Sequence, residues 1–518
     1  MTLLEKLLSK GYFPKEALPP FSTKSYAIAI TENYDNLPNL YRNNKHISRC
    51  AIHNISRKGT LRRKLGIPNP VNFFRLSEAI TENWHDIYEC TNKSHLSLTT
   101  PTLSDAGDRA FDRKHSLNEL PELHAMLRSK HKYILKTDIS RFYHSVYTHS
   151  VAWTYHSKDI AKKNRSSSLF GNLVDKYLQD SQDGQTIGIP IGPDTSLVVA
   201  ESILACVDEK LKENGIENGL RYIDDYFLGF NTIGEAESAL TLMQELLNEY
   251  ELALNPLKTE IIQLPCEFEP LAISELRSFS FRETEGGQRS DLIHYFNIAF
   301  KAAKDMPTES ILKYAVSRTF EVEVTKNNYN FFESFILQCA TADSSTLKYV
   351  ANQLIKYKRK GYQSNLENIS HILTQLGISE SSLGHGNEVA YCLWLFLVLE
   401  ISIPEDLTKN IVHMRDPFVA ILLCDCFDKG LMAYKPDFTI YEKLMVKDEL
   451  LSDMWLFVYE MLAREWFNPV SNQNPVKQNE CFNFLFKSNV HFYDDKLSLT
   501  VSAESPIDIN DALPGFSG

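Results

Sequence analysis

Apolar residues follow different spacings in the two parts of the chain. Before residue 291, short runs of aromatic and aliphatic residues are typical of half-buried strands. These runs are 133–137, 220–223 and 226–230. Residues 199–211 instead carry an apolar side chain at every fourth position, which predicts a helix with one apolar face. The mixture of strand-like and helical segments indicates an α+β domain over residues 1–290.

After residue 291, helical spacing of apolar residues recurs and strand-like alternation becomes rare. The segments with helical spacing are 309–320, 331–339, 345–358, 389–399, 417–427 and 441–463. Helices of this length joined by short polar loops are typical of stacked helix pairs. We therefore predict an all-α, helical-repeat-like C-terminal domain over residues 291–518.

The composition indicates a protein of the cell interior. The chain has 518 residues, of which 43% are hydrophobic and 23% charged, as is ordinary for globular proteins with several domains. The longest apolar run, 389–399, is too short to span a membrane, and the first residues lack the features of a signal peptide. Nine scattered cysteines in a chain of this size indicate a reducing environment. We expect a cytoplasmic protein without a membrane partner.

Charge is distributed unevenly along the chain. The net charge is −12, and residues from 361 onward, with 22 acidic and 10 basic side chains, account for all of it. The segment 42–75 has the opposite character, because it contains nine basic residues and no acidic one. A charged run is often only a solvated face, but this one also fits a phosphate-facing surface. The nine residues are Arg42, Lys45, Arg49, Arg57, Lys58, Arg62, Arg63, Lys64 and Arg75.

The segment RYIDDYFLGF, residues 221–230, places Asp224 and Asp225 side by side between two strand-like runs. An ordinary solvated turn would explain two aspartates at this position. A metal site explains them as well, because Mg²⁺ prefers oxygen ligands and a cation relieves the repulsion between neighbouring carboxylates. A third carboxylate in reach would favour the metal site.

Asp138 supplies that third carboxylate, at the end of the predicted strand 133–137. By itself it is equally well explained as a strand-terminating residue. Three carboxylates from a strand end and a hairpin turn can converge on two metal ions, which clamp the attacking and leaving oxygens of a phosphoryl transfer. Asp138, Asp224 and Asp225 are therefore the candidate catalytic residues and metal ligands.

Two further segments contain candidate nucleotide contacts. GIPIGPDTS, residues 188–196, is a glycine- and proline-rich loop that leads into a predicted helix, and such a loop lets backbone approach a nucleotide or template strand. Lys258, in LNPLKTE, is either a surface lysine or a group that neutralises or protonates the leaving pyrophosphate.

Read in order, TDISRFY, GIPIGPDTS, YIDD and LNPLKTE resemble the successive palm motifs of reverse transcriptases, and LRRKLGIPNPVNFFRL resembles the fingers motif that precedes them. The resemblance covers about residues 55–275. It implies a right-hand polymerase with fingers and an antiparallel palm sheet packed with helices. It also implies an RNA-directed DNA polymerase, or nucleotidyltransferase, that uses dNTPs. Two Mg²⁺ ions, with Mn²⁺ as the expected substitute, would be held by the three aspartates.

The resemblance also assigns nucleotide-binding positions. Tyr143 occupies the place of the aromatic steric gate that excludes a 2′-hydroxyl, so it favours deoxynucleotides. The other positions implied for nucleotide, triphosphate or template contact are Phe142, Pro190, Gly192, Lys258, Arg62, Arg63 and Arg75.

The second palm motif departs from the common pattern. Many reverse transcriptases have Pro-Gln-Gly there, whereas this chain has Pro190-Ile191-Gly192, and an apolar side chain cannot hydrogen-bond a template as glutamine can. GIPIGPDTS most resembles the abortive-infection and related phage-defence reverse transcriptases of bacteria. That resemblance implies a helical C-terminal domain, oligomeric assembly and, in some members, template-free synthesis of DNA attached to a protein hydroxyl. The sequence does not name the hydroxyl, although Tyr26, Tyr34 and Tyr41 lie in a polar N-terminal segment.

Two alternatives remain at this stage. One is a retron-like reverse transcriptase that copies a separate RNA. The other is a non-catalytic nucleic-acid-binding scaffold that acts through its helical domain. Retention of three mutually repelling carboxylates argues against the scaffold.

Overall fold

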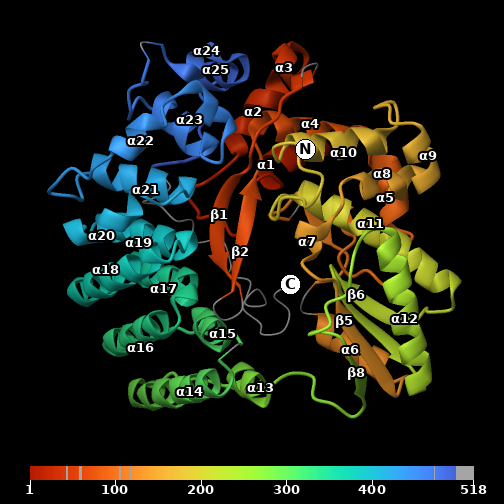
Figure 1. The fold of residues 1–518 in the computed structure, drawn as a ribbon. Coiled ribbons are helices and arrows are strands. Elements are labelled where there is room, and N and C mark those ends of the chain that lie inside the picture. The colour runs from red at the N-terminus through yellow and green to blue at the C-terminus, as the bar shows by residue number, and fades with distance from the viewer. Residues whose placement is uncertain are drawn as a thin grey trace.

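The structure, a computed structural model, describes residues 1–42, 45–57, 61–103, 107–116, 119–307, 309–471 and 473–496. Figure 1 shows three parts side by side: a sheet with its covering helices, a two-stranded hairpin, and a curved layer of C-terminal helices. No helix in these residues is long and apolar enough to cross a membrane.

A four-stranded antiparallel sheet forms the centre of the first part, which we call the sheet region. Its strand order is β6-β7-β5-β8. The strands are β5 (Tyr133–Asp138), β6 (Gly219–Tyr222), β7 (Asp225–Phe230) and β8 (Glu260–Gln263). Helix α12 (Ile233–Glu249) packs on β5 and β7, and α6 (Leu120–Arg128) packs on β6. The predicted mixture of antiparallel strands and helices is confirmed.

Helix α11 (Asp194–Glu213) is the long central helix of the sheet region. It begins directly after Pro193, as the sequence predicts, because proline is compatible with a helix start. The chain leaves it through Gly215, whose φ of 82° lies in the left-handed region that glycine adopts without strain.

The other elements of the first part of the chain surround this sheet and helix. The helices are α1 (Leu3–Lys10), α2 (Lys24–Glu32), α3 (Asn39–Arg42), α4 (Pro70–Glu82), α5 (Trp84–Thr91), α7 (Phe142–Ser145), α8 (His149–His156), α9 (Lys158–Lys163) and α10 (Phe170–Asp180). The remaining strand pairs are β1 (Ala51–Ser56) with β2 (Arg62–Ile67) and β3 (Pro101–Leu103) with β4 (Phe111–Arg113).

The β1–β2 hairpin lies between the sheet region and the C-terminal helices (Figure 1). On one side, the backbone N–H of Gly66 donates to the carbonyl of Ile191 in the 188–193 loop at 2.9 Å. On the other side, β1 packs against α19 (Gly386–Leu399) and α21 (Pro417–Asp428). The hairpin therefore links the two halves of the molecule.

All regular elements in the described part of the chain after β8 are helices. The α-helices are α13 (Leu271–Ser278), α14 (Glu285–Asp305), α15 (Ile311–Arg318), α16 (Tyr329–Ala342), α17 (Leu347–Arg359), α18 (Leu366–Ser382), α19, α20 (Glu405–Ile411), α21, α22 (Thr439–Lys443), α23 (Trp455–Ala463), α24 (Pro475–Gln478) and α25 (Glu480–Lys487).

One predicted helix is wrong. The structure breaks 441–463 into α22, a 3₁₀ turn at Lys447–Leu451 and α23. Polar residues between the apolar ones, among them Asp448 and Ser452, allow the chain to turn so that Leu450 and Trp455 are both buried. Tertiary burial here overrides the local helical spacing.

The hydrophobic cores divide the chain differently from the predicted boundary at 290/291. One core joins the N-terminal helices and the β1–β2 hairpin to residues 273–493. The other fills the sheet region. Helix α14 runs across the predicted boundary, and the indole N–H of Trp455 donates to the carbonyl of Ile67 at 3.1 Å. The C-terminal helices therefore share their core with the start of the chain.

Candidate active site

The fold brings the three predicted aspartates together at one end of the sheet. Asp138 ends β5 and Asp225 begins β7, and the two stand opposite each other in the antiparallel register. Asp224 lies in the turn that joins β6 to β7, and its carbonyl accepts a hydrogen bond from the N–H of Ile139 at 3.3 Å. Asp138 and Asp225, 87 positions apart in the chain, thus share one edge because β5 and β7 pair directly.

The electrostatics of this edge favour a cation. Burial raises the pKa of Asp224 to about 7, and the neighbouring Asp225 and Asp138 add to the increase. Burial also raises the pKa of Asp225, although the Lys258 ammonium opposes the increase. Ionised carboxylates held this close repel one another, so a positive charge among them is stabilising.

Lys258 supplies a positive charge in this structure. Its Nζ donates to Oδ2 of Asp138 at 2.5 Å, while Nδ2 of Asn255 donates to Oδ1 of the same carboxylate at 2.9 Å. The structure thus places Lys258 beside Asp138, and its predicted role toward the leaving pyrophosphate stays a prediction. Asn255 was not predicted, although it belongs to the same LNPLKTE motif.

The donor set suits Mg²⁺, which prefers carboxylate oxygens and is held by few protein ligands plus substrate phosphates and water. In this structure Lys258 is bound to Asp138, and the three aspartates are not among the groups whose ligand atoms all lie within 4.8 Å of one another. Among the described residues, the group of three whose ligand atoms all lie within 4.8 Å of one another is a different one, Glu380, His385 and Glu388. Both oxygens of Glu388 already accept hydrogen bonds from Arg62, so the Arg62 guanidinium supplies the positive charge for that group.

The two predicted aromatic residues lie differently. Phe142 is 2% exposed and belongs to the core of the sheet region, so its predicted contact with nucleotide is not supported. Tyr143 is half-buried, and burial, followed by the charge of Asp224, raises the pKa of its hydroxyl. Tyr143 is therefore within electrostatic range of Asp224, and its role as a steric gate stays a prediction.

The loop 188–193 connects the site to its surroundings mainly through its backbone. Pro190 is buried against Gly66 of β2, and the carbonyl of Gly192 accepts a hydrogen bond from Nη2 of Arg109 at 3.0 Å. Gly192 has a φ of 123°, and a Cβ there would lie 2.6 Å from Pro14. The two residues shape the loop, and their predicted nucleotide contact stays a prediction.

The three predicted arginines are not brought together. Arg63 lies within electrostatic range of Asp224 and Tyr143 and is partly buried. Arg62 instead pairs with Glu388 of α19, and Arg75 is 3% exposed, with its Nε donating to the carbonyl of Tyr41 at 3.2 Å. Only Arg63 has a position that fits triphosphate or template contact.

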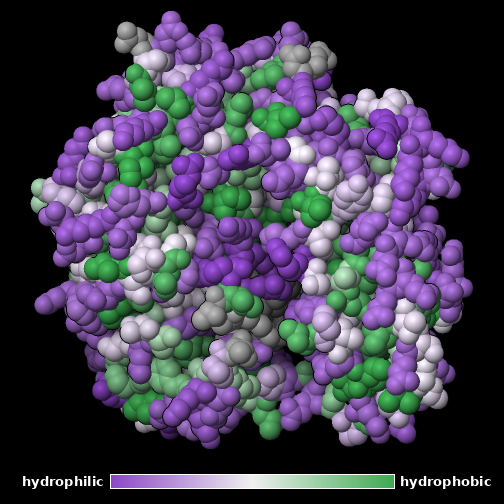
Figure 2. All heavy atoms as spheres, viewed as in Figure 1, coloured by the Kyte–Doolittle hydropathy of each residue, from purple (hydrophilic) through white to green (hydrophobic). Residues whose placement is uncertain are grey.

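The basic run 42–75 is likewise divided. Arg42 stacks on Tyr34 with its guanidinium carbon 4.5 Å from the ring centre, and Arg49 pairs with Asp183 at 3.0 Å. Arg57 lies within electrostatic range of Asp225, and Lys64 is exposed. Lys58 lies outside the described residues. Figure 2 shows a hydrophilic surface in the middle of this face, at the place of the hairpin in Figure 1.

The three N-terminal tyrosines are packed. Tyr26 and Tyr41 are both fully buried, which excludes a mobile position for them in this structure. The hydroxyl of Tyr34 donates to Glu78 at 2.7 Å, and this hydrogen bond raises its pKa to about 12.

Comparison with known proteins identifies part of the chain. Residues 76–273 match the family described as "Reverse transcriptase (RNA-dependent DNA polymerase)". All four palm-like motifs lie within the match, so this part of the chain is a domain of reverse-transcriptase type. None of the curated proteins matches the sequence.

One solved structure with similarity is described as telomerase from Candida albicans in complex with the TWJ fragment of telomeric RNA. The identity is 10% and the TM-score 0.29, over 64% of this chain and 65% of that one. The chain thus spans less than two thirds of that protein, and a likeness this distant does not define the fold or the function.

Proposed function

We propose that the protein is a reverse-transcriptase-type DNA polymerase that joins deoxynucleotides in bacterial defence against phage. The observation that carries the proposal is the convergence of Asp138, Asp224 and Asp225 on one sheet edge, inside the matched domain. The same three acids are not required by the fold, since burying like charges together is costly.

The chain's own groups divide the work of phosphoryl transfer. Asp138, Asp224 and Asp225 would hold two Mg²⁺ ions, which supply charge stabilisation for the attacking and leaving oxygens. Lys258, which pairs with Asp138 in this structure, would neutralise or protonate the leaving pyrophosphate once released from that carboxylate. Tyr143, within electrostatic range of Asp224, would exclude a 2′-hydroxyl, while Arg63 would attract the triphosphate.

The abortive-infection assignment rests on the second palm motif and on the C-terminal helices. Ile191 takes the place of a template-contacting glutamine, and its carbonyl accepts a hydrogen bond from the N–H of Gly66 in the hairpin. This supports synthesis without a template. Attachment of the product to a protein hydroxyl and assembly into a homo-oligomer are further parts of the proposal. The buried Tyr26 and Tyr41 would need a conformational change to serve as primers.

The experiment combines purified protein, Mg²⁺ and labelled dNTPs without template or primer, beside Asp224→Asn. Products are separated on a denaturing gel before and after protease and nuclease treatment. We expect long labelled DNA that shifts on protease treatment and is absent with the variant. Incorporation that requires added or copurified RNA would instead support the retron-like alternative. No incorporation with any template would overturn the polymerase proposal, and phage protection by Asp224→Asn would support a scaffold.

A further inference from the structure

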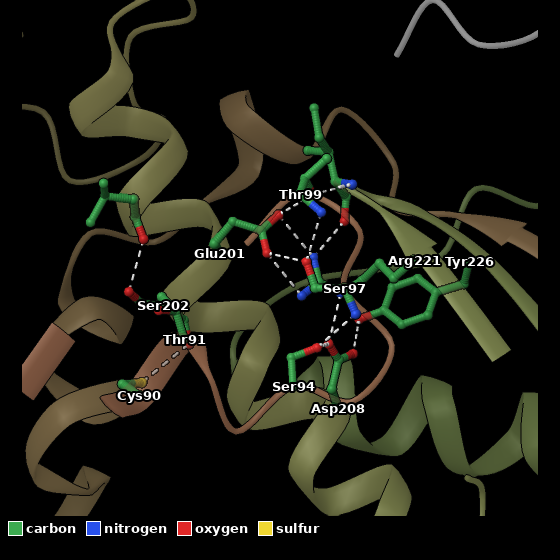
Figure 3. Close-up of polar contacts among 12 residues, drawn as sticks. Cys90, Thr91, Ser94, Ser97, Thr99, Glu201, Ser202, Asp208, Arg221 and Tyr226 are labelled. Atoms are coloured by element: carbon green, nitrogen blue, oxygen red, sulfur yellow. Dashed lines mark hydrogen bonds and ion pairs between the residues drawn. The ribbon is translucent and has the colours of Figure 1, made fainter. Parts of the chain in front are cut away.

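A buried polar network surrounds Arg221 (Figure 3) and is hydrogen-bonded to Ile223, the residue before Asp224. Its centre is Arg221, a fully buried residue of β6. The guanidinium donates to both oxygens of Glu201, at 3.1 Å each, and to Oδ2 of Asp208 at 2.8 Å. Glu201 and Asp208 lie two helical turns apart on α11, so Arg221 ties the sheet to this helix.

The network holds the turn by two hydrogen bonds to Ile223. Nη1 of Arg221 donates to the carbonyl of Ile223 at 2.9 Å. The N–H of Ile223 donates to Oγ1 of Thr99 at 3.1 Å, and the Thr99 hydroxyl in turn donates to Oε1 of Glu201 at 2.6 Å. Glu201 therefore accepts hydrogen bonds from both residues that hold the turn, Thr99 and Arg221, and Asp208 binds Arg221 as well.

The turn needs this support because Ile223 has a left-handed backbone. Its φ is 54°, a region that β-branched residues avoid because the side chain crowds the backbone. The next residue is Asp224, so any relaxation at Ile223 redirects the Asp224 side chain and shifts the start of β7 at Asp225.

Each carboxylate oxygen of the network has a partner. Two acids face one guanidinium, and hydroxyl groups satisfy what remains of their hydrogen-bonding capacity. The hydroxyl donors are Ser94 and Tyr226 to Asp208, and Ser97 and Thr99 to Glu201. A buried network with every member satisfied is rigid and specifies one geometry.

We propose that Arg221, Glu201 and Thr99 are positioning residues that hold Ile223 in its left-handed conformation and so aim Asp224 and Asp225 at the reacting centre. The inference rests on the proposed polymerase function. None of the three contacts the acids' side chains directly in the hydrogen bonds of this structure, so they act through the turn.

Thr99 offers the sharpest test, because valine has the same shape without the hydroxyl. We expect Thr99→Val to lower kcat by about ten- to hundredfold, with a much smaller change in the KM for dNTP. Mn²⁺ binding to the protein alone, measured by electron paramagnetic resonance, is expected to weaken by about tenfold. Thr99→Ser retains the hydroxyl and should restore both values.

The matched control is Ser202→Ala, which removes a buried hydroxyl from α11 next to Glu201. That hydroxyl bonds Tyr155 and the carbonyl of Val198, and neither the turn nor Arg221. It should leave Mn²⁺ affinity unchanged. Wild-type kcat and Mn²⁺ affinity in Thr99→Val, or equal impairment in Thr99→Ser, would overturn the inference.

The measurements distinguish failure of the polymerase proposal from failure of the positioning proposal. If the wild-type protein incorporates no dNTP, the polymerase proposal fails, and the Mn²⁺ titration of the same variants still decides whether the network positions the acids. If circular dichroism shows that Thr99→Val does not fold, Glu201→Gln is measured instead. It preserves the side-chain shape, and the same losses are expected; unchanged Mn²⁺ binding in that variant counts against the inference.

Discussion

Arg62 of the hairpin and Glu388 of α19 form a bidentate ion pair, with Nη1–Oε1 at 3.0 Å and Nη2–Oε2 at 2.6 Å. Glu388 is fully buried, whereas the Arg62 side chain is 19% exposed. The pair joins the strand that carries Arg63 to the C-terminal helices. An arginine predicted to bind phosphate thus connects two parts of the molecule.

Removing one partner of this pair should destabilise the protein. Arg62→Ala leaves a buried carboxylate without its cation, so we expect a loss of about 2 to 4 kcal/mol in the free energy of unfolding. The double variant Arg62→Met, Glu388→Met should recover much of that loss, because both charges are gone. Urea denaturation measures the free energy of unfolding of the single and the double variant, with a change at an exposed residue, Lys64→Ala, as the control. Equal stability of Arg62→Ala and Lys64→Ala would show that the pair contributes nothing.

The contact between His53 and Asp416 predicts a pH dependence of stability. Nδ1 of His53 lies 2.7 Å from Oδ2 of Asp416, in full burial. Burial lowers the pKa of His53, but the Asp416 carboxylate, helped by Asn387 and Glu388, outweighs burial and raises it above the usual value near 6.5.

A raised histidine pKa stabilises the folded protein fully below the unfolded pKa, and this contribution is lost as the pH rises through the folded pKa. We expect the stability advantage of wild-type protein over His53→Gln to shrink from pH 6 to pH 9, by on the order of 1 kcal/mol. Denaturation at several pH values measures it. A difference that stays constant or grows with pH would contradict the assignment.

Asp224 should reduce stability at neutral pH in the absence of metal. Its pKa is raised to about 7 by burial and by its acidic neighbours. This group therefore lowers the free energy of unfolding as the pH rises from the unfolded-state pKa, at about 4, to about 7, and the loss is complete above that. Asp224→Asn should therefore be more stable than wild type at pH 8, by roughly 1 to 3 kcal/mol, with little difference at pH 4. Thermal unfolding in a chelator tests this, with the exposed Asp305→Asn as control. Added Mg²⁺ should then stabilise wild type and not Asp224→Asn.

Lys258 should act on the rate of chemistry. Lys258→Gln retains a hydrogen-bonding side chain but removes the positive charge and the proton donor, so kcat should fall by about a hundredfold while the KM for dNTP changes little. Single-turnover incorporation at several dNTP concentrations separates the effect on the rate of chemistry from the effect on dNTP binding. A rise in KM with unchanged kcat would instead assign Lys258 to substrate binding.

Tyr143 should determine the choice of sugar. Tyr143→Ala removes a ring that lies within electrostatic range of Asp224, so the preference for dNTPs over rNTPs should fall by at least about tenfold. Incorporation of each nucleotide class at matched concentrations measures the ratio. Phe142→Leu, a change in the core beside it, should leave the ratio unchanged, and equal effects of the two variants would remove Tyr143 from this role.

The sequence by itself determined the acidic site and most of the helices. Asp138, Asp224 and Asp225 could be placed because each stands at a strand end or turn, where local residue preferences decide the backbone. Antiparallel pairing of β5 with β7 then brings them together. Apolar spacing predicted most C-terminal helices correctly, because helical spacing is also a local property. The prediction of one helix over 441–463 was wrong, because burial of Leu450 and Trp455 required a break in it.

Tertiary structure alone decided the partners of charged residues. Arg62 pairs with a residue 326 positions away, and Arg221 becomes a buried support only because α11 presents Glu201 and Asp208 to it. Arg75 and Phe142 were assigned to nucleotide by motif, yet both are buried by neighbours that no local pattern specifies. The physical reason is that burial and ion pairing depend on which distant segments the fold places side by side, whereas turns and helices depend on neighbours in sequence.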